Sequence, residues 1–151
     1  MIGYSDSDLA GDIDDRKSTM GVDYFLGGNP VAWLSQKQRV VALSSCEAKY
    51  VTATTAACQG VWLGRLLSEI KGGKPIKAVL NIDNQSVIAL TKNPVHHDRS
   101  KHIDTKYHFV HDCVPKEEIE VKYVRTEDQL ANVLTSHSVD KGLSSCERRL
   151  V

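Results

Sequence analysis

The sequence has no excess of charge of either sign. Lysine and arginine together number 19, and aspartate and glutamate together also number 19, so the formal net charge is zero. A chain without net charge has no global field to attract nucleic acid or an anionic membrane surface. Any charged ligand must therefore be bound by a local patch of side chains, which directs attention to local motifs.

Long apolar runs, internal repeats and low-complexity segments are also missing. No run approaches the roughly 20 apolar residues that a membrane-spanning helix requires, so we expect a soluble protein with no membrane partner. A chain of 151 residues can bury one core but not two ordinary ones. We therefore expect a single domain, while neither composition nor motif specifies an oligomeric state.

Cysteine is scarce, and its four positions lack the close paired spacing of a zinc site. This favours reduced, mostly structural thiols. The positions are Cys46, Cys58, Cys113 and Cys146. Histidines crowd one stretch of the chain and, with Cys113, leave a zinc site open as an alternative. These histidines are His96, His97, His102, His108 and His111.

Periodicity predicts three strands in the first third of the chain, over residues 1–5, 21–26 and 31–34. The run Gly-Gly-Asn-Pro at 27–30 predicts a hairpin between the second and third. The remaining predicted elements are a helix from Ser44 to about Ile70, a buried strand over 78–82, a helix capped by Asn84 that ends near Leu90, a basic loop over 96–101, a helix over 103–114, a strand over 119–123 and a helix over 127–134. This order predicts an α/β fold, a mixed sheet flanked by helices. We expect a domain over 1–136 and a polar, partly disordered tail over 137–151.

The long predicted helix carries the clearest local signals. Ser44 and Glu47 match a capping box, so the helix should begin close to Glu47, and the glycines at 72 and 73 should end it. Its apolar positions fall nearly on one face. They are Ala48, Val51, Thr55, Cys58, Trp62, Leu66 and Ile70. Trp62 and Trp33 are both expected in the core.

Three carboxylates stand where they would converge if the predicted strands pair. Asp6 lies where the first strand ends, Glu47 in the opening turn of the long helix, and Asp83 directly after the central strand. Oxygen ligands of this kind suit hard divalent cations, and two ions about 3.5 to 4 Å apart can promote phosphodiester hydrolysis. Each residue alone also has a structural explanation, because strand ends and first helical turns commonly carry acidic caps. Spacing alone leaves both interpretations open.

Eight sequence blocks, taken in order, resemble one known family. The blocks are 3–12 (GYSDSDLAGD), 15–19 (DRKST), 42–50 (ALSSCEAKY), 83–86 (DNQS), 92–94 (KNP), 100–104 (SKHID), 107–109 (YHF) and 126–131 (TEDQLA). They resemble the ribonuclease H domain of copia-type (Pseudoviridae-like) LTR retrotransposon Pol polyproteins, over residues 3 to about 135. The resemblance implies a ribonuclease H-like fold with a mixed five-stranded sheet. It also implies an endonuclease that cleaves the RNA strand of RNA/DNA hybrids during reverse transcription.

The resemblance further implies a site for two Mg²⁺ ions, with Mn²⁺ able to replace them. Carried over by position, Asp6, Glu47 and Asp83 are metal ligands and three of the family's four catalytic carboxylates. The fourth position holds Asn132, which offers an oxygen but no negative charge. Asp128, four residues earlier on the predicted helix, is a candidate substitute. We expect a weakened enzyme; the alternative is a decayed or domesticated copy that binds nucleic acid or protein without cutting.

A hybrid is bound through its phosphates and 2′-hydroxyls, for which basic side chains, small polar side chains and helix starts are suited. Several residues beside the predicted carboxylates or in basic segments fit this role, although each can equally be an exposed polar residue or a cap. They are Ser45, Cys46, Asn84, Gln85, Ser86, Lys37, Arg99, Lys101 and His102. The family implies the reverse transcriptase domain of the same polyprotein as a partner. It also implies a cytoplasmic particle whose DNA later enters the nucleus.

Overall fold

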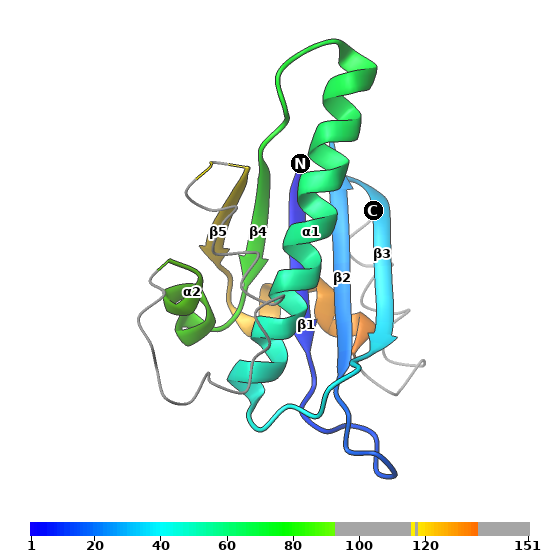
Figure 1. Cartoon of the computed structure of the whole chain (residues 1–151), viewed down its shortest axis with the longest axis vertical. Coiled ribbons are helices and arrows are strands. Elements are labelled where there is room, and N and C mark those ends of the chain that lie inside the picture. The colour runs from blue at the N-terminus through cyan, green and yellow to red at the C-terminus, as the bar shows by residue number, and fades with distance from the viewer. Residues whose placement is uncertain (93–115, 117, 136–151) are drawn as a thin grey trace.

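The computed structural model describes residues 1–92, 116 and 118–135 (Figure 1). Its elements are β1 (Ile2–Ser7), β2 (Thr19–Leu26), β3 (Asn29–Lys37), α1 (Ser45–Lys71), β4 (Ala78–Ile82), α2 (Gln85–Lys92), β5 (Ile119–Tyr123) and the 3₁₀ helices η3 (Thr126–Asp128) and η4 (Leu130–Leu134). The predicted helix over 103–114, the histidine-rich stretch and the predicted tail over 137–151 lie outside the described residues. Among the residues described, no helix is both long and apolar enough to cross a membrane.

A five-stranded mixed sheet with the order β3-β2-β1-β4-β5 forms the centre of the fold. The first three strands pair antiparallel, whereas β4 is parallel to β1 and β5 is parallel to β4. This confirms the predicted fold class. The crossover through α1 returns the chain so that β1 and β4 end at the same edge of the sheet (Figure 1). Residues that follow these two strands are therefore brought together.

The predicted hairpin between β2 and β3 is confirmed, with a tighter turn than expected. Gly27 and Gly28 have φ values of 59° and 83°, so the turn consists of two residues that both need the left-handed region. Asn29 and Pro30, expected in the loop, belong to β3. β1 likewise extends to Ser7, which places Asp6 within the strand rather than at its end.

The cap predicted for the long helix is confirmed. The hydroxyl of Ser44 accepts a hydrogen bond from the backbone N–H of Glu47 at 3.1 Å, and the helix begins at Ser45. At the other end, Gly72 adopts the left-handed conformation and its N–H donates to the carbonyl of Ser68. The helix lies against one face of the sheet (Figure 1).

The face of α1 predicted to be buried is confirmed at Ala48 and Val51 but is wrong farther along the helix. Trp62 is 60% exposed, and small residues make most of the buried side. A Cβ added at Gly60 would lie 2.4 Å from the hydroxyl oxygen of Tyr24, and one added at Gly64 would lie 2.4 Å from the carbonyl oxygen of Ile76. The buried side of the helix combines glycines and alanines with Tyr50, Val61 and Leu63, whereas Trp62 and Ile70 turn outward. Trp33 is 71% exposed, so the core role expected for both tryptophans is wrong.

The α-helix predicted over residues 127–134 is also wrong. The segment forms η3 and η4, which are interrupted at Gln129, whose backbone is extended at φ −76° and ψ 102°. The buried side-chain amide of Gln129 donates to the carbonyl oxygens of Ser5 at 3.1 Å and Asn81 at 3.4 Å. These acceptors lie where β1 and β4 stop bonding to each other, so the interruption satisfies buried carbonyl groups. η4 lies against β1 and β2, across the sheet from α1 (Figure 1).

Candidate functional site

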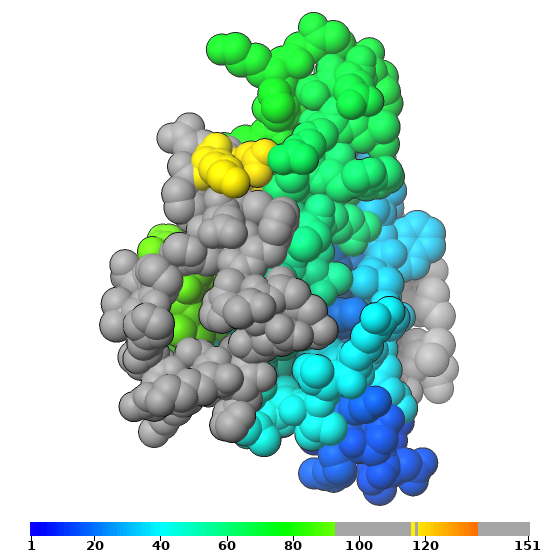
Figure 2. Space-filling model, in the orientation of Figure 1, coloured from blue at the N-terminus to red at the C-terminus, as the bar shows by residue number. Residues whose placement is uncertain are grey.

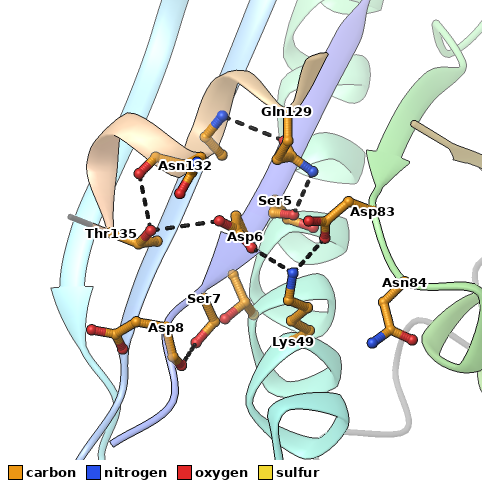
Figure 3. Close-up of polar contacts among 12 residues, drawn as sticks. Ser5, Asp6, Ser7, Asp8, Lys49, Asp83, Asn84, Gln129, Asn132 and Thr135 are labelled. Carbon is orange, nitrogen blue, oxygen red and sulfur yellow. Dashed lines mark hydrogen bonds and ion pairs between the residues drawn. The ribbon is translucent and has the colours of Figure 1, made fainter. Parts of the chain in front are cut away.

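Two aspartates meet at the edge of the sheet where β1 and β4 end. Asp6 lies in β1 and Asp83 directly follows β4. Figure 3 shows both carboxylates pointing toward one lysine side chain between them. Both carboxylates are buried. The structure therefore brings together two of the three carboxylates that the sequence predicts to converge.

The lysine between them is Lys49 of α1, which sequence reasoning missed. Its Nζ lies 2.9 Å from Asp6 Oδ1 and 2.6 Å from Asp83 Oδ1 (Figure 3). The ammonium donates a hydrogen bond to Asp83, whereas its contact with Asp6 Oδ1 is an ion pair. The correct phase of α1 would have revealed this residue, because Lys49 shares a helix face with Thr52 and Ala56, both fully buried.

Burial and the ion pairs have opposite effects on the pKa values of Asp6 and Lys49. Burial raises the pKa of the Asp6 carboxyl above its ordinary value, and the nearby charge of Lys49 offsets this only in part. Burial lowers the pKa of Lys49, but its contacts with Asp83 and Asp6 outweigh that effect, so the pKa lies above its ordinary value. Lys49 therefore remains a cation at neutral pH.

Glu47, the third predicted carboxylate, is not brought to this pair. Its Oε2 accepts a hydrogen bond from the backbone N–H of Leu43 at 2.9 Å. The carboxylate thus belongs to the cap of α1, where it satisfies a free backbone donor. Two helical positions separate Glu47 from Lys49, which amounts to a rotation of about 200°. The geometry therefore does not support the roles predicted for Glu47 as catalytic residue and metal ligand.

Asn132 and Asp128 do not share a helix face, because η3 ends before Gln129. Asp128 is exposed, and its Oδ2 lies 3.6 Å from Nε of Arg125. The geometry therefore does not support the prediction that Asp128 replaces a fourth carboxylate. Thr135 lies between Asp6 and Asn132 of η4: its hydroxyl lies 3.0 Å from the carbonyl oxygen of Asn132 and 3.5 Å from Asp6 Oδ2 (Figure 3).

The predicted hybrid-binding residues next to Asp83 form the start of α2. Asn84 is a cap, because its Oδ1 accepts a hydrogen bond from the backbone N–H of Val87 at 3.1 Å. Gln85 and Ser86 are exposed. At the start of α1, Ser45 is exposed and Cys46 is half-buried. Gln85, Ser86 and Ser45 have the exposure that contact with a nucleic acid requires, and the binding role of all five side chains stays a prediction.

Lys37 has acidic partners within the protein. Its Nζ forms ion pairs with Asp12 and, at 3.2 Å, with Asp15. Both aspartates belong to the connection between β1 and β2, which projects from the end of the sheet (Figures 1 and 2). Lys37 therefore links this loop to the end of β3. The other basic candidates, Arg99, Lys101 and His102, lie outside the described residues.

The residues present do not fit two divalent ions. Within residues 1–92, 116 and 118–135, no three histidine, cysteine, aspartate or glutamate side chains gather closely enough to hold a metal. Asp6 and Asp83 already share the positive charge of Lys49. A site for two divalent ions needs several anionic oxygens, and neither Lys49 nor Asn132 supplies a negative charge.

Two plant transposon polyproteins are similar to this chain in sequence. It is 41% identical over 133 residues to the retrovirus-related Pol polyprotein from transposon TNT 1-94 of Nicotiana tabacum, which covers 88% of this chain and 10% of that protein. It is also 41% identical over 132 residues to the corresponding polyprotein from transposon RE2 of Arabidopsis thaliana, with 87% and 9% covered. The chain thus spans about a tenth of the length of these relatives. No protein-family profile matches it.

Solved structures resemble this chain in fold at low sequence identity. LC11-RNase H1 in complex with an RNA/DNA hybrid aligns with a TM-score of 0.64 and 14% identity, over 94% of this chain and 98% of that one. The protease-reverse transcriptase of prototype foamy virus aligns with a TM-score of 0.58 and 13% identity, over 99% of this chain and 20% of that one. At such identities the similarity concerns the fold alone.

Proposed function

This chain is a homologue of the retrovirus-related Pol polyproteins of plant transposons and has the ribonuclease H fold, and from that premise we propose that it is a weakened ribonuclease H domain acting on RNA/DNA hybrids. The observation that carries the proposal is the Asp6–Asp83 pair at the common end of the parallel strands β1 and β4. Paired carboxylates at such an edge are suited to phosphodiester chemistry.

The surroundings of the pair are suited to a sugar-phosphate backbone. The start of α2 lies directly beyond Asp83 and carries the exposed Gln85 and Ser86. Small polar side chains and backbone N–H groups at a helix start are common phosphate ligands. A backbone bound along this helix start would place a phosphate next to Asp6 and Asp83. The LC11-RNase H1 structure contains an RNA/DNA hybrid, which supports the same class of substrate here.

Cleavage in this proposal is weak because the residues present do not fit two divalent ions. Mg²⁺ or Mn²⁺, when bound, would activate water and stabilise the leaving oxygen. Asp6 and Asp83 are the side chains available to hold such an ion, and both are engaged by Lys49. The protein's own residues can therefore bind and orient a hybrid more effectively than they can cut it.

A second candidate function is hybrid binding without cleavage, in a decayed or domesticated copy. The bridge formed by Lys49 favours it, because this ammonium neutralises part of the charge that would attract a metal. As an enzyme, we propose, the domain acts beside the reverse transcriptase domain of a copia-type polyprotein, in a cytoplasmic particle. The small share of each polyprotein that this chain spans fits one domain among several.

The experiment is cleavage of an end-labelled RNA/DNA hybrid by the purified chain, with Mg²⁺, with Mn²⁺ and with chelator. The variants Asn132→Asp and Asp83→Asn are assayed beside it, and hybrid and duplex DNA binding are measured separately in chelator. Metal-dependent cutting of the RNA strand that Asp83→Asn abolishes supports the enzyme. Hybrid-selective binding without cutting supports the second candidate, and equal affinity for hybrid and duplex DNA together with no cutting contradicts both.

A further inference from the structure

We infer that Lys49 is a tethered cation that takes the place of a divalent ion between Asp6 and Asp83, and that Lys49→Glu converts this cluster into a metal site. The inference rests on the proposed function in one respect, namely that Asp6 and Asp83 are the carboxylates of the hydrolytic site. Nothing in the sequence resemblance assigns a role to Lys49.

The bridge occupies the space that an ion would need. Nζ of Lys49 lies 2.9 Å from Asp6 Oδ1 and 2.6 Å from Asp83 Oδ1, distances typical of charge-assisted contacts. A Mg²⁺ ion bound to the same two oxygens would lie about 2.0 to 2.1 Å from each. The ammonium and the ion cannot occupy this position together. Metal binding therefore requires Lys49 to leave, and its side chain is only 17% exposed.

The rest of the fold holds position 49 in place. The buried amide of Gln38 donates to the carbonyl oxygen of Ala48 at 2.8 Å and to the hydroxyl of Thr52 at 3.1 Å, on either side of Lys49. Farther along α1, the close approach of Gly60 to Tyr24 fixes the rotation of the helix. A different side chain at position 49 would therefore still point at Asp6 and Asp83.

Glutamate at this position has a suitable length. Its carboxylate oxygens end about one carbon–carbon bond, or about 1.5 Å, short of the place that Nζ occupies. That gap leaves room for an ion about 2 Å from each oxygen. Lys49→Glu would also change the local charge from one negative to three negative, which is the direction that attracts a divalent cation. The substitution supplies a ligand and removes the competing cation at once.

The test is metal binding by the full chain, measured by calorimetry with Mg²⁺ and by the paramagnetic resonance signal of free Mn²⁺. Four proteins are compared: wild type, Lys49→Glu, Lys49→Met and the control Lys74→Glu, which makes the same change of charge at an exposed lysine. We expect Lys49→Glu to bind Mn²⁺ at least about 100-fold tighter than wild type and Lys49→Met about tenfold tighter. Lys74→Glu should bind as wild type does.

Several outcomes would overturn the inference. It fails if wild type binds Mn²⁺ as tightly as Lys49→Glu, or if Lys74→Glu gains as much affinity. It also fails if Asp83→Asn leaves the gain of Lys49→Glu intact, because the ion would then lie elsewhere. Circular dichroism checks that each variant is folded, and Lys49→Met decides the question if Lys49→Glu unfolds. Hybrid cleavage by wild type is scored separately, so a gain of metal affinity in Lys49→Glu with no cutting by wild type would refute the enzyme while leaving the role of Lys49 standing.

Discussion

Asp6 and Asp23 lie on the adjacent strands β1 and β2 and are 6% and 8% exposed, yet their surroundings differ. Asp6 has Lys49 within 2.9 Å. Asp23 has no cation beside it among the described residues, and its Oδ1 accepts no hydrogen bond there. It lines a largely apolar cleft of about 700 Å³, together with side chains such as Phe25, Trp33 and Leu134. The two carboxylates are thus about equally buried, but among the described residues only Asp6 has a cation beside it.

Because the two aspartates are about equally buried, they show separately how burial and a neighbouring cation affect the pKa of a carboxyl group. Burial raises the pKa of the Asp23 carboxyl to about 7, and no nearby cation lowers it. Burial also raises the pKa of Asp6, but Lys49 counteracts the effect. The comparison teaches that a cation beside a buried aspartate counteracts the rise in pKa that burial causes. Two kinds of substitution test this comparison: one removes Lys49 from Asp6, and the other supplies a cation beside Asp23.

The largest effect is expected from Lys49→Met, which leaves Asp6 and Asp83 close together without a cation. Removing one partner of a buried ion pair should lower the free energy of unfolding by about 3 to 5 kcal/mol at pH 7. Urea denaturation measures it, with Lys74→Met as the exposed control. Adding Asp83→Asn to Lys49→Met should recover part of the loss. A change under about 1 kcal/mol would contradict the pairing.

The next effect concerns the pH dependence caused by Asp23. Its pKa is about 7 in the folded protein, above the ordinary 3.8, so the stability it contributes is fully present below about pH 4 and is lost as pH rises through 7. Asp23→Val should remove this loss and stabilise the protein at pH 8 by about 2 to 4 kcal/mol. Thermal unfolding from pH 4 to 8 measures it. Asp14→Val, at an exposed position, should leave the slope unchanged.

A smaller effect follows from giving Asp23 a cation. Trp33 pairs directly with Asp23 across β2 and β3, so the two side chains lie on the same face of the sheet. Trp33→Lys should lower the pKa of Asp23 from about 7 by roughly one to two. A carboxyl ¹³C titration by NMR measures this pKa. The control Trp33→Met removes the ring without adding charge and should leave the pKa of Asp23 near 7. An equal fall of this pKa in both variants would show that hydration, and not the added cation, caused the fall.

The smallest effect is expected from Thr135→Val, which removes the hydroxyl 3.5 Å from Asp6 Oδ2. At that distance the contact is weak, and the hydroxyl lies closer to the carbonyl oxygen of Asn132, at 3.0 Å. The loss in the free energy of unfolding should be about 0.5 to 1 kcal/mol. Urea denaturation measures it, and a loss above about 2 kcal/mol would mean that Asp6 depends on Thr135 as well as on Lys49.

Local spacing was enough to predict much of the fold. Alternation located the strands, the two glycines located the β2–β3 turn, and Ser44 located the start of α1, because each depends on residues close in the chain. The meeting of Asp6 and Asp83 was also predictable, since parallel strands end at the same edge of a sheet.

Only the tertiary structure decided which side of each helix faces the site. Close packing of Gly60 against Tyr24 sets the rotation of α1, so Lys49 rather than Glu47 reaches the aspartates. The bonds of Gln129 to Ser5 and Asn81 likewise interrupt the predicted last helix. Hydrophobic spacing determines that a helix forms, whereas its rotation depends on contacts between residues distant in the chain.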